Sequence, residues 1–206
     1  MKVLLVNGSP RSECCTYTAL SEVGGALEKN GIETEMFQIG TSPVYGCLNC
    51  GKCRQGGRCV LNDELYNTLL DKIIEADGLV VGSPVYFSGP NGALCALLDR
   101  VFFTSGGKFT HKPAACVVSC RRGGASASFD RLNKYFTIAQ MPVVTSRYWN
   151  SVHGTNPDEV RRDIEGLQVM RTLGNNMAWM LKLIESGPQP SEQEEGRIFT
   201  SFADGK

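Results

Sequence analysis

The chain has 206 residues, of which 42% are hydrophobic and 20% are charged, as in an ordinary globular domain. Its 21 basic and 21 acidic residues give a formal net charge of zero, so no overall field draws it to nucleic acid or to an anionic membrane. Only Lys2 and a short apolar run precede Asn7, which fits neither a signal peptide nor a membrane span. We therefore expect one cytoplasmic domain whose partners are small molecules or other proteins.

The N-terminal segment predicts a strand, a loop and a helix. Residues 3–6 form an apolar run without alternation, which is typical of a strand buried on both faces of a parallel sheet. The polar loop 7–12 follows, and a helical pattern then runs over residues 16–30. Thr16 or Thr18 is the expected N-cap of that helix.

The loop after the first strand has the chemistry of a phosphate site. Gly8 permits a tight turn, Ser9 and Thr16 bring hydroxyl groups, and Arg11 brings a charged donor. The free amides at a helix N-terminus attract phosphate. Neither common glycine-rich nucleotide motif occurs here. Two interpretations of the loop therefore remain: a site for a phosphate-bearing cofactor, or an ordinary turn between a strand and a helix.

The rest of the chain alternates between strand and helix patterns. Further strands are expected at 32–39, 78–82, 112–119 and 142–146, and further helices at 63–76, 93–103, 126–140 and 156–185. This alternation predicts an α/β fold, a doubly wound five-stranded parallel sheet with helices on both faces. Ligands of such sheets bind beyond the carboxyl ends of the strands, so the loops 8–16, 84–91 and 119–124 are expected to meet.

The segment between the second strand and the next helix is rich in cysteine. Four of the nine cysteines of the chain, Cys47, Cys50, Cys53 and Cys59, lie in this insertion at residues 40–60. Without a signal sequence, such clustering indicates metal or redox chemistry more than disulfide bridges. The spacing leaves three interpretations open: an iron-sulfur cluster, a zinc ion or free thiols.

The polar C-terminal tail at 188–206 has too few apolar residues to fold alone. We expect a folded domain over 1–187, with a tail that is either frayed or anchored on a partner subunit by Ile198, Phe199 and Phe202.

Three features together resemble one family. Gly8-Ser9-Pro10-Arg11 follows the first strand, Gly82-Ser83-Pro84-Val85-Tyr86 follows the third, and the cysteine loop lies between them. Over roughly residues 1–185 the chain resembles the flavodoxin-like NADPH-dependent FMN reductases and, more narrowly, the iron-sulfur flavoproteins. The resemblance implies strand order 2-1-3-4-5, FMN at the strand ends, and a homodimer or homotetramer in which a neighbouring subunit helps to cover the flavin.

The resemblance also implies site residues. It implies that the FMN phosphate is held by Ser9, Arg11, Thr16 and the backbone of Cys15. The ribityl chain and the ring would then lie along Pro84, Val85, Tyr86 and Phe87. The other edge of the ring would face Ser119, Arg121, Gly123 and Gly124. The usual Gly-Asn-Thr of the family is Cys14-Cys15-Thr16 here, which leaves backbone amides and Thr16 for that contact. The implied ligands of a [4Fe-4S] cluster are Cys47, Cys50, Cys53 and Cys59.

The function expected from this reading is an FMN-dependent oxidoreductase. Electrons would pass from NAD(P)H or a reduced ferredoxin to a small acceptor such as a quinone, a nitro compound or a flavin. Arg121 and Arg122 have guanidinium groups suited to the NADPH phosphate. The alternatives are a non-enzymatic carrier that relays electrons between redox partners through FMN and a [4Fe-4S] cluster, and a module that only binds flavin.

Overall fold

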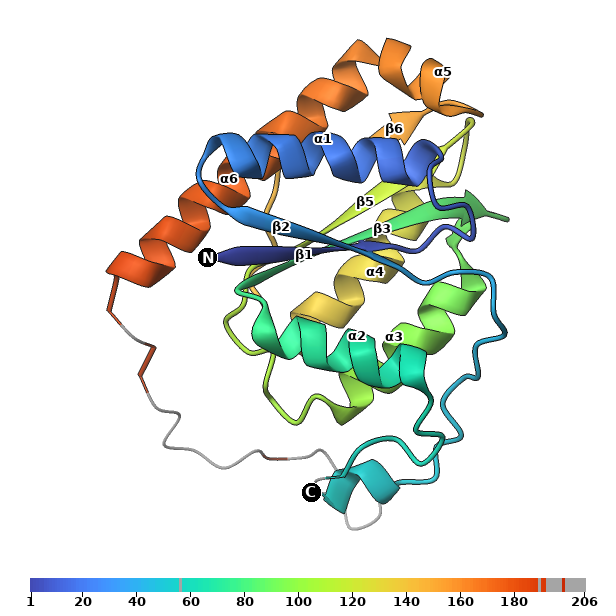
Figure 1. The fold of residues 1–206 in the computed structure, drawn as a ribbon, viewed down its shortest axis with the longest axis vertical. Helices are drawn as coiled ribbons and strands as arrows, with labels where there is room; N and C mark the ends of the chain where they lie inside the picture. The colour runs from blue at the N-terminus through green and yellow to red at the C-terminus, as the bar shows by residue number, and fades with distance from the viewer. Residues whose placement is uncertain (56, 189, 192–197, 199–206) are drawn as a thin grey trace.

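A parallel sheet forms the centre of the molecule (Figure 1). The computed structural model describes residues 1–55, 57–188, 190, 191 and 198. Its parallel strands are β1 (Lys2–Asn7), β2 (Glu33–Gln38), β3 (Gly78–Tyr86), β5 (Ala114–Cys120) and β6 (Ser151–His153), in the order β2-β1-β3-β5-β6. Numbered among the parallel strands alone, this is the expected order 2-1-3-4-5, which is confirmed.

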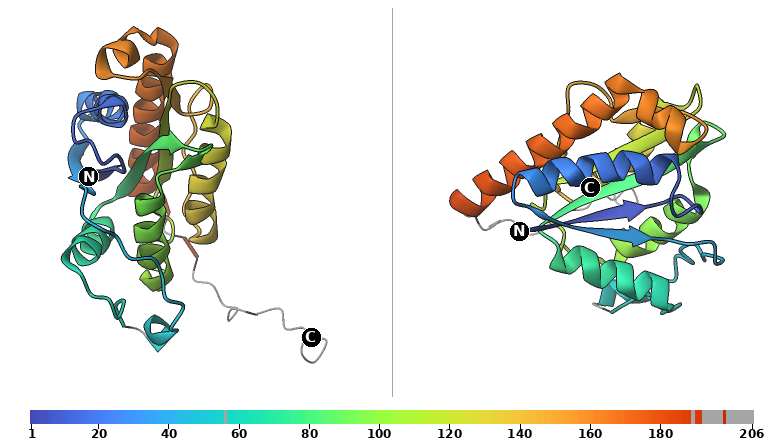
Figure 2. Two further views of the ribbon diagram at one scale, coloured as in Figure 1. Left: turned by 90° about the vertical axis from the view of Figure 1, so that its right-hand side faces the viewer. Right: turned by 45° about the horizontal axis from the view of Figure 1, so that its top comes forward.

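Helices cover both faces of the sheet, as the two views of Figure 2 show. One face carries α1 (Cys15–Lys29), α5 (Pro157–Arg162) and α6 (Ile164–Ser186), and the other carries α2 (Glu64–Glu75), α3 (Gly92–Thr104) and α4 (Ala125–Ile138). In β1, Val3 and Leu5 pack toward the first group of helices, while Leu4 and Val6 pack toward the second. The unalternated apolar run is therefore a strand buried on both faces, as predicted.

Strand β3 is longer than its apolar run predicted. It continues beyond Gly82 to Tyr86 and then turns back, so that the two-residue strand β4 (Gly89–Pro90) pairs with its end in antiparallel register. The turn residues Phe87 and Ser88 have positive φ angles of 49° and 61°. A small hairpin thus projects from the carboxyl edge of the sheet.

The expected N-cap of the first helix is wrong. The helix begins at Cys15, so Cys14 is the N-cap and Thr16 lies inside the first turn. The hydroxyl of Thr18 donates 3.2 Å back to the Cys14 carbonyl instead of capping an amide.

The expected fifth strand is also misplaced. Of residues 142–146, only Val143 forms a bridge, to Ala114, and the described strand at this edge is β6. The chain leaves the sheet between the two contacts and returns at Asn150, whose buried side chain donates 3.0 Å to the Cys116 carbonyl. That long-range hydrogen bond has no local sequence signature.

The single helix expected over 156–185 is two helices. Asp163 ends α5, and its carboxylate accepts the Gly166 amide at 2.9 Å to cap α6. The apolar periodicity continues across this break, which is why the pattern predicted one helix.

Two further points concern the ends of the chain. Phe199 and Phe202 of the tail lie outside the described residues, whereas Ile198 is exposed. Among the helices that the structure describes, none is both long and apolar enough to cross a membrane.

Candidate functional site

The three loops that were expected to meet form a cleft at the carboxyl edge of the sheet. It holds about 570 Å³ of space, including its open mouth. The cleft is lined by Ser9, Arg11, Cys14, Cys15, Thr16, Pro84, Val85, Tyr86, Ser119, Cys120, Arg121, Gly154 and Thr155. We call it the strand-end cleft.

Side-chain hydrogen bonds fix the loop after β1. The Asn7 side chain accepts the Ser9 amide at 3.1 Å and donates to the Ser12 carbonyl at 3.0 Å. Gln38 of β2 donates to the Ser9 carbonyl at 2.6 Å, and the Ser9 hydroxyl accepts the Arg11 amide at 3.1 Å. The loop is therefore shaped before any ligand binds.

Close backbone packing joins this loop to β3. The Gly8 amide donates to the Gly82 carbonyl at 2.8 Å, and a Cβ on Gly8 would lie 2.4 Å from Leu94. The Asn91 side chain donates to the Gly8 carbonyl at 2.7 Å and also caps α3 through the Ala93 amide. The first and third loops are thus held in register across the sheet.

Two of the described helices have open N-termini, and one of them, α1, begins at the cleft. In the described part of the chain, α1 and α4 have no side-chain cap, and neither has an acidic residue in its first turn. The N-caps of α2, α3, α5 and α6 are Asp63, Asn91, Asn156 and Asp163, and each accepts a backbone amide with its side chain. The free amides at the positive end of α1 therefore suit a bound anion such as a phosphate in the cleft.

Hydroxyl groups lie beside these amides. Thr16 in the first turn of α1 and Ser119 near the end of β5 are both buried, and their oxygens lie 2.8 Å apart. Ser9 is buried at the same edge. The donors present, free amides, hydroxyls and the guanidinium of Arg11, therefore fit the phosphate of FMN.

Most of the residues that sequence reasoning placed at the flavin line this cleft. Among the described residues, the exceptions are Phe87, Gly123 and Gly124. Phe87 is fully exposed at the tip of the hairpin. Gly124 has a φ of 91° and packs so closely on the hairpin that a Cβ would lie 2.7 Å from Ser88 Cα, so it fixes the hairpin instead of lining the cleft.

Four lining residues were not in the expected flavin set: Cys14, Cys120, Gly154 and Thr155. Gly154 and Thr155 follow β6, the strand that the sequence placed too early, so the expected site lacked that loop. A correct position for β6 would have found them. His153, one residue earlier, points its Nδ1 toward Asp163 at 3.4 Å and is exposed.

The thiols of the cleft differ in acidity. Partial burial alone would raise the pKa of Cys14. Hydrogen bonds from the Cys15 amide and from Arg11 outweigh that effect and lower the pKa of Cys14 below its ordinary value. Burial, with the neighbouring Cys14, raises the pKa of Cys15 to about 11. Cys14 is thus the more reactive thiol of the pair, whose sulfurs lie 3.9 Å apart.

The cysteine loop forms a second, separate hollow, which we call the cysteine pocket; it holds about 370 Å³ of space, including its open mouth. Its lining includes Cys47, Cys50, Cys53 and Cys59 together with Arg100, Phe103 and Thr104 of α3. The structure thus brings all four predicted metal-ligand cysteines around one space. The thiols are free, and within the described residues no three acidic, histidine or cysteine side chains lie close enough to hold one metal ion. The donor set, four thiols that line one pocket, fits an iron-sulfur cluster in its chemistry.

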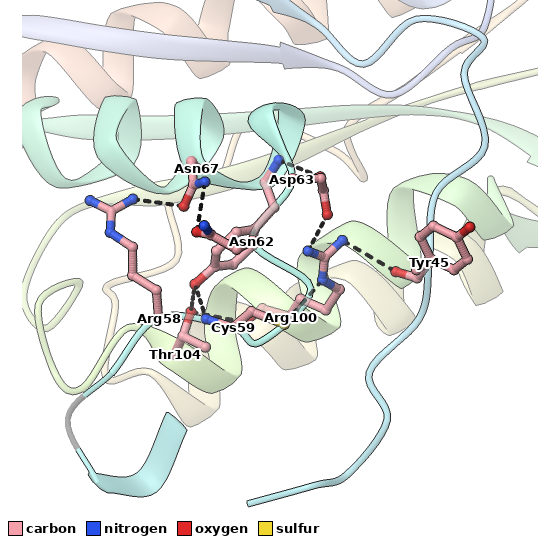
Figure 3. A network of polar contacts seen from close by, with 9 residues as sticks. Tyr45, Arg58, Cys59, Asn62, Asp63, Asn67, Arg100 and Thr104 are labelled. Carbon is pink, nitrogen blue, oxygen red and sulfur yellow. Dashed lines mark hydrogen bonds and ion pairs between the residues drawn. The ribbon is translucent and has the colours of Figure 1, made fainter. Parts of the chain in front are cut away.

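The cysteine pocket is tied to the body of the protein by one network (Figure 3). Arg100 pairs with Asp63, and its Nε donates to Cys59 Sγ at 3.5 Å. The Cys59 amide donates to the Tyr66 hydroxyl at 3.1 Å. The same Tyr66 hydroxyl lies 2.7 Å from the Thr104 hydroxyl. Helices α2 and α3 therefore hold the last cysteine of the loop.

The fold and the strand-end cleft define a doubly wound protein built to bind a phosphate-bearing cofactor. A family model for NADPH-dependent FMN reductases matches residues 1–156. An iron-sulfur flavoprotein of Methanocaldococcus jannaschii is 34% identical over 90% of this chain and 100% of its own length. Another, from Methanosarcina thermophila, is 30% identical over 90% of this chain and 97% of its own length.

The fold has a matching solved structure. A flavodoxin from the domain Archaea superposes with a TM-score of 0.61 and 15% identity, over 88% of this chain and 99% of the flavodoxin. The chain therefore belongs to the flavodoxin-like family of NADPH-dependent FMN reductases and iron-sulfur flavoproteins. It is a member of a family of flavin-dependent oxidoreductases, and the family supports FMN as its cofactor.

Proposed function

We propose that this protein transfers electrons from NAD(P)H, or from a reduced ferredoxin, through FMN to a small acceptor such as a quinone, a nitro compound or a flavin. The single observation that supports this most is the strand-end cleft, at which α1 begins with an open N-terminus beside buried hydroxyl groups. FMN bound there would supply hydride and single-electron chemistry. The protein supplies binding and orientation.

Each part of the cleft has a distinct task in this proposal. The amides at the start of α1, with Ser9, Arg11 and Thr16, bind the phosphate. Pro84, Val85 and Tyr86 line one side of the remaining space, and Ser119 and Arg121 line the other. Arg121 is exposed at the mouth, where its guanidinium is suited to a phosphate of NADPH.

The cysteine pocket supports a second cofactor. We propose that Cys47, Cys50, Cys53 and Cys59 ligate a [4Fe-4S] cluster, because four thiols around one mostly apolar hollow match the ligand chemistry of such clusters. Free thiols or a zinc ion are the other outcomes of the test.

Anaerobic purification tests both cofactors. We expect a spectrum with flavin bands and a broad cluster band, and equal amounts of FMN and cluster by iron and acid-labile sulfide assay. Protein reconstituted with FMN should oxidise NADPH or NADH in steady state when a quinone is present. A protein that binds no FMN after reconstitution would overturn the proposal.

The cysteine pocket also favours a second candidate, an electron carrier between redox proteins. A carrier should show negligible turnover with pyridine nucleotides and rapid reduction by ferredoxin. Stopped-flow reduction with each donor separates the two functions.

We also propose that the protein works as a homodimer or homotetramer. The exposed aromatic side chains of Tyr86 and Phe87, at the hairpin beside the cleft, support an interface there. Light scattering after size exclusion should give a dimer or tetramer, and Phe87→Ala should weaken it; a monomeric wild-type protein contradicts this proposal.

A further inference from the structure

A charged side chain is buried directly behind the cysteine pocket. Arg100 of α3 is only 1% exposed and heads the largest fully buried side chains of the described residues. Burying a guanidinium is costly unless its charge is paired and its donors are satisfied. The surroundings of Arg100 therefore indicate what it stabilises.

Its partners flank the cysteine loop on both sides (Figure 3). Tyr45, which precedes the cysteines, accepts a hydrogen bond from Nη1 through its carbonyl at 3.5 Å. Asp63, which follows them, forms an ion pair with Nη2. The guanidinium also lies 4.7 Å from the centre of the Tyr66 ring, within the range of a cation–π contact. Arg100 thus joins the start and the end of the loop.

The Nε donor of Arg100 faces a thiol. Nε of Arg100 points at Cys59 Sγ, and Arg100 lines the cysteine pocket together with all four cysteines. The other basic residues of the loop differ, because Lys52 and Arg54 are exposed and Arg58 pairs with Asp71 in contact with water. Only a buried cation acts on its neighbours with little screening.

We propose that Arg100 is a positioning residue for the cluster, one that orients Cys59 and makes the cluster easier to reduce. The inference rests on the [4Fe-4S] cluster of the proposed function. In the step concerned, one electron from a reductant such as dithionite enters the cluster, and no bond to the protein forms or breaks. The added negative charge is stabilised by a nearby cation and by a hydrogen bond to a ligand sulfur, and both raise the reduction potential.

The ion pair with Asp63 gives the inference an opposite-sign test. Arg100→Gln removes the positive charge, so the potential should become more negative. Asp63→Asn removes the opposing negative charge, so the potential should become more positive. Asn remains a good N-cap, so this second variant keeps the start of α2 intact.

Two further variants separate charge from packing. Arg100→Lys keeps the positive charge but loses the planar guanidinium group. The potential of this variant should therefore lie between those of the wild type and Arg100→Gln, and closer to the wild type. Arg58→Gln removes a charge that is half-exposed beside Cys59, and its potential should stay unchanged because water screens it. A purely structural role of Arg100 would not produce this pattern.

The experiment is a potentiometric titration of anaerobically purified, full-length protein, followed by electron paramagnetic resonance, with iron and sulfide assays and circular dichroism on every variant. Opposite shifts in Arg100→Gln and Asp63→Asn support the inference. Equal potentials in these two variants and the wild type overturn it. If Arg100→Gln assembles no cluster, the potential of Asp63→Asn decides: a shift to a more positive value supports the inference, and any other result overturns it. A wild-type protein without iron and sulfide overturns the cluster of the proposed function, and the inference with it, while the FMN site is judged by its own spectrum.

Discussion

The strand-end cleft and the cysteine pocket are built in different ways. The cleft lies where strands end and helices begin, so its donors are backbone amides and buried hydroxyls fixed by the sheet. The cysteine pocket is formed by a loop whose described regular structure is one short 3₁₀ turn, Lys52–Gln55. Its attachment is made by side chains, above all by Arg100. The comparison shows that the rigid fold positions one site, while a few polar contacts position the other.

The largest expected effect would show that the two sites are independent. Cys50→Ser should abolish the iron and sulfide content, because Cys50 is one of the four proposed cluster ligands, in a pocket that shares no lining residue with the cleft. FMN content should stay at the wild-type level. Cys95→Ser, on α3 outside both sites, is the control. Loss of FMN together with iron in Cys50→Ser would show that the sites depend on each other.

The rigidity of the cleft is tested at Gly8. Gly8→Ala places a Cβ 2.4 Å from Leu94 and 2.6 Å from the Gly82 carbonyl, and should cost about 1–3 kcal/mol of unfolding free energy. Gly25→Ala is the matched control: among the described residues nothing lies within 4 Å of its Cβ, and helix propensity should stabilise it by up to about 1 kcal/mol. Urea denaturation measures both. Equal unfolding free energies for Gly8→Ala and Gly25→Ala would mean that the backbone around Gly8 adjusts to a Cβ at little cost.

Thr16→Val tests the hydroxyls of the cleft. It leaves the buried Ser119 hydroxyl without its partner and removes a proposed phosphate donor, so FMN should bind about tenfold more weakly. Iron content should not change. Thr172→Val, whose hydroxyl donates to a carbonyl on α6, should leave FMN affinity intact. Fluorescence titration with FMN measures the dissociation constants.

Thiol reactivity distinguishes neighbouring residues of the cleft. The pKa of Cys14 is lowered and that of Cys15 is raised to about 11, so FMN-free protein at neutral pH should be alkylated at Cys14 about tenfold faster than at Cys15. The Cys14 rate should level off at a lower pH than that of an ordinary thiol. Added FMN should protect Cys14, because Cys14 lines the cleft that FMN would fill. Iodoacetamide labelling followed by mass spectrometry gives both rates, and faster labelling of Cys15 would contradict the assignment.

The smallest expected effect concerns the mouth of the cleft. Arg121→Ala should raise the KM for NADPH about threefold, since an exposed guanidinium contributes less than about 1 kcal/mol to phosphate binding. Arg122→Ala, next to it but not on the described lining of the cleft, should leave KM unchanged. Steady-state kinetics with equal FMN loading separates the two, and identical KM values would exclude the role of Arg121.

The sequence by itself determined that strands alternate with helices and where the first loop lies, whereas the order of the parallel strands came from the family resemblance. The apolar runs of β1, β3 and β5 are buried on both faces, which needs no information beyond the run itself. Ser9 and Thr16 line the cleft, as expected, because the loop between a strand and a helix has a fixed position relative to both. The cysteines were found from their spacing, and the structure places them around one pocket.

Only the tertiary structure decided what depends on contacts between distant residues. The edge strand moved from 142–146 to Ser151–His153 because Asn150 binds the Cys116 carbonyl, and this shift brought Gly154 and Thr155 into the cleft. Arg100 sits in an ordinary helical pattern, and its ion pair with Asp63 and its contact with Cys59 join residues 37 and 41 positions apart. Local periodicity indicates which face of a segment is apolar. It does not indicate which distant polar residue will contact that segment in the folded protein.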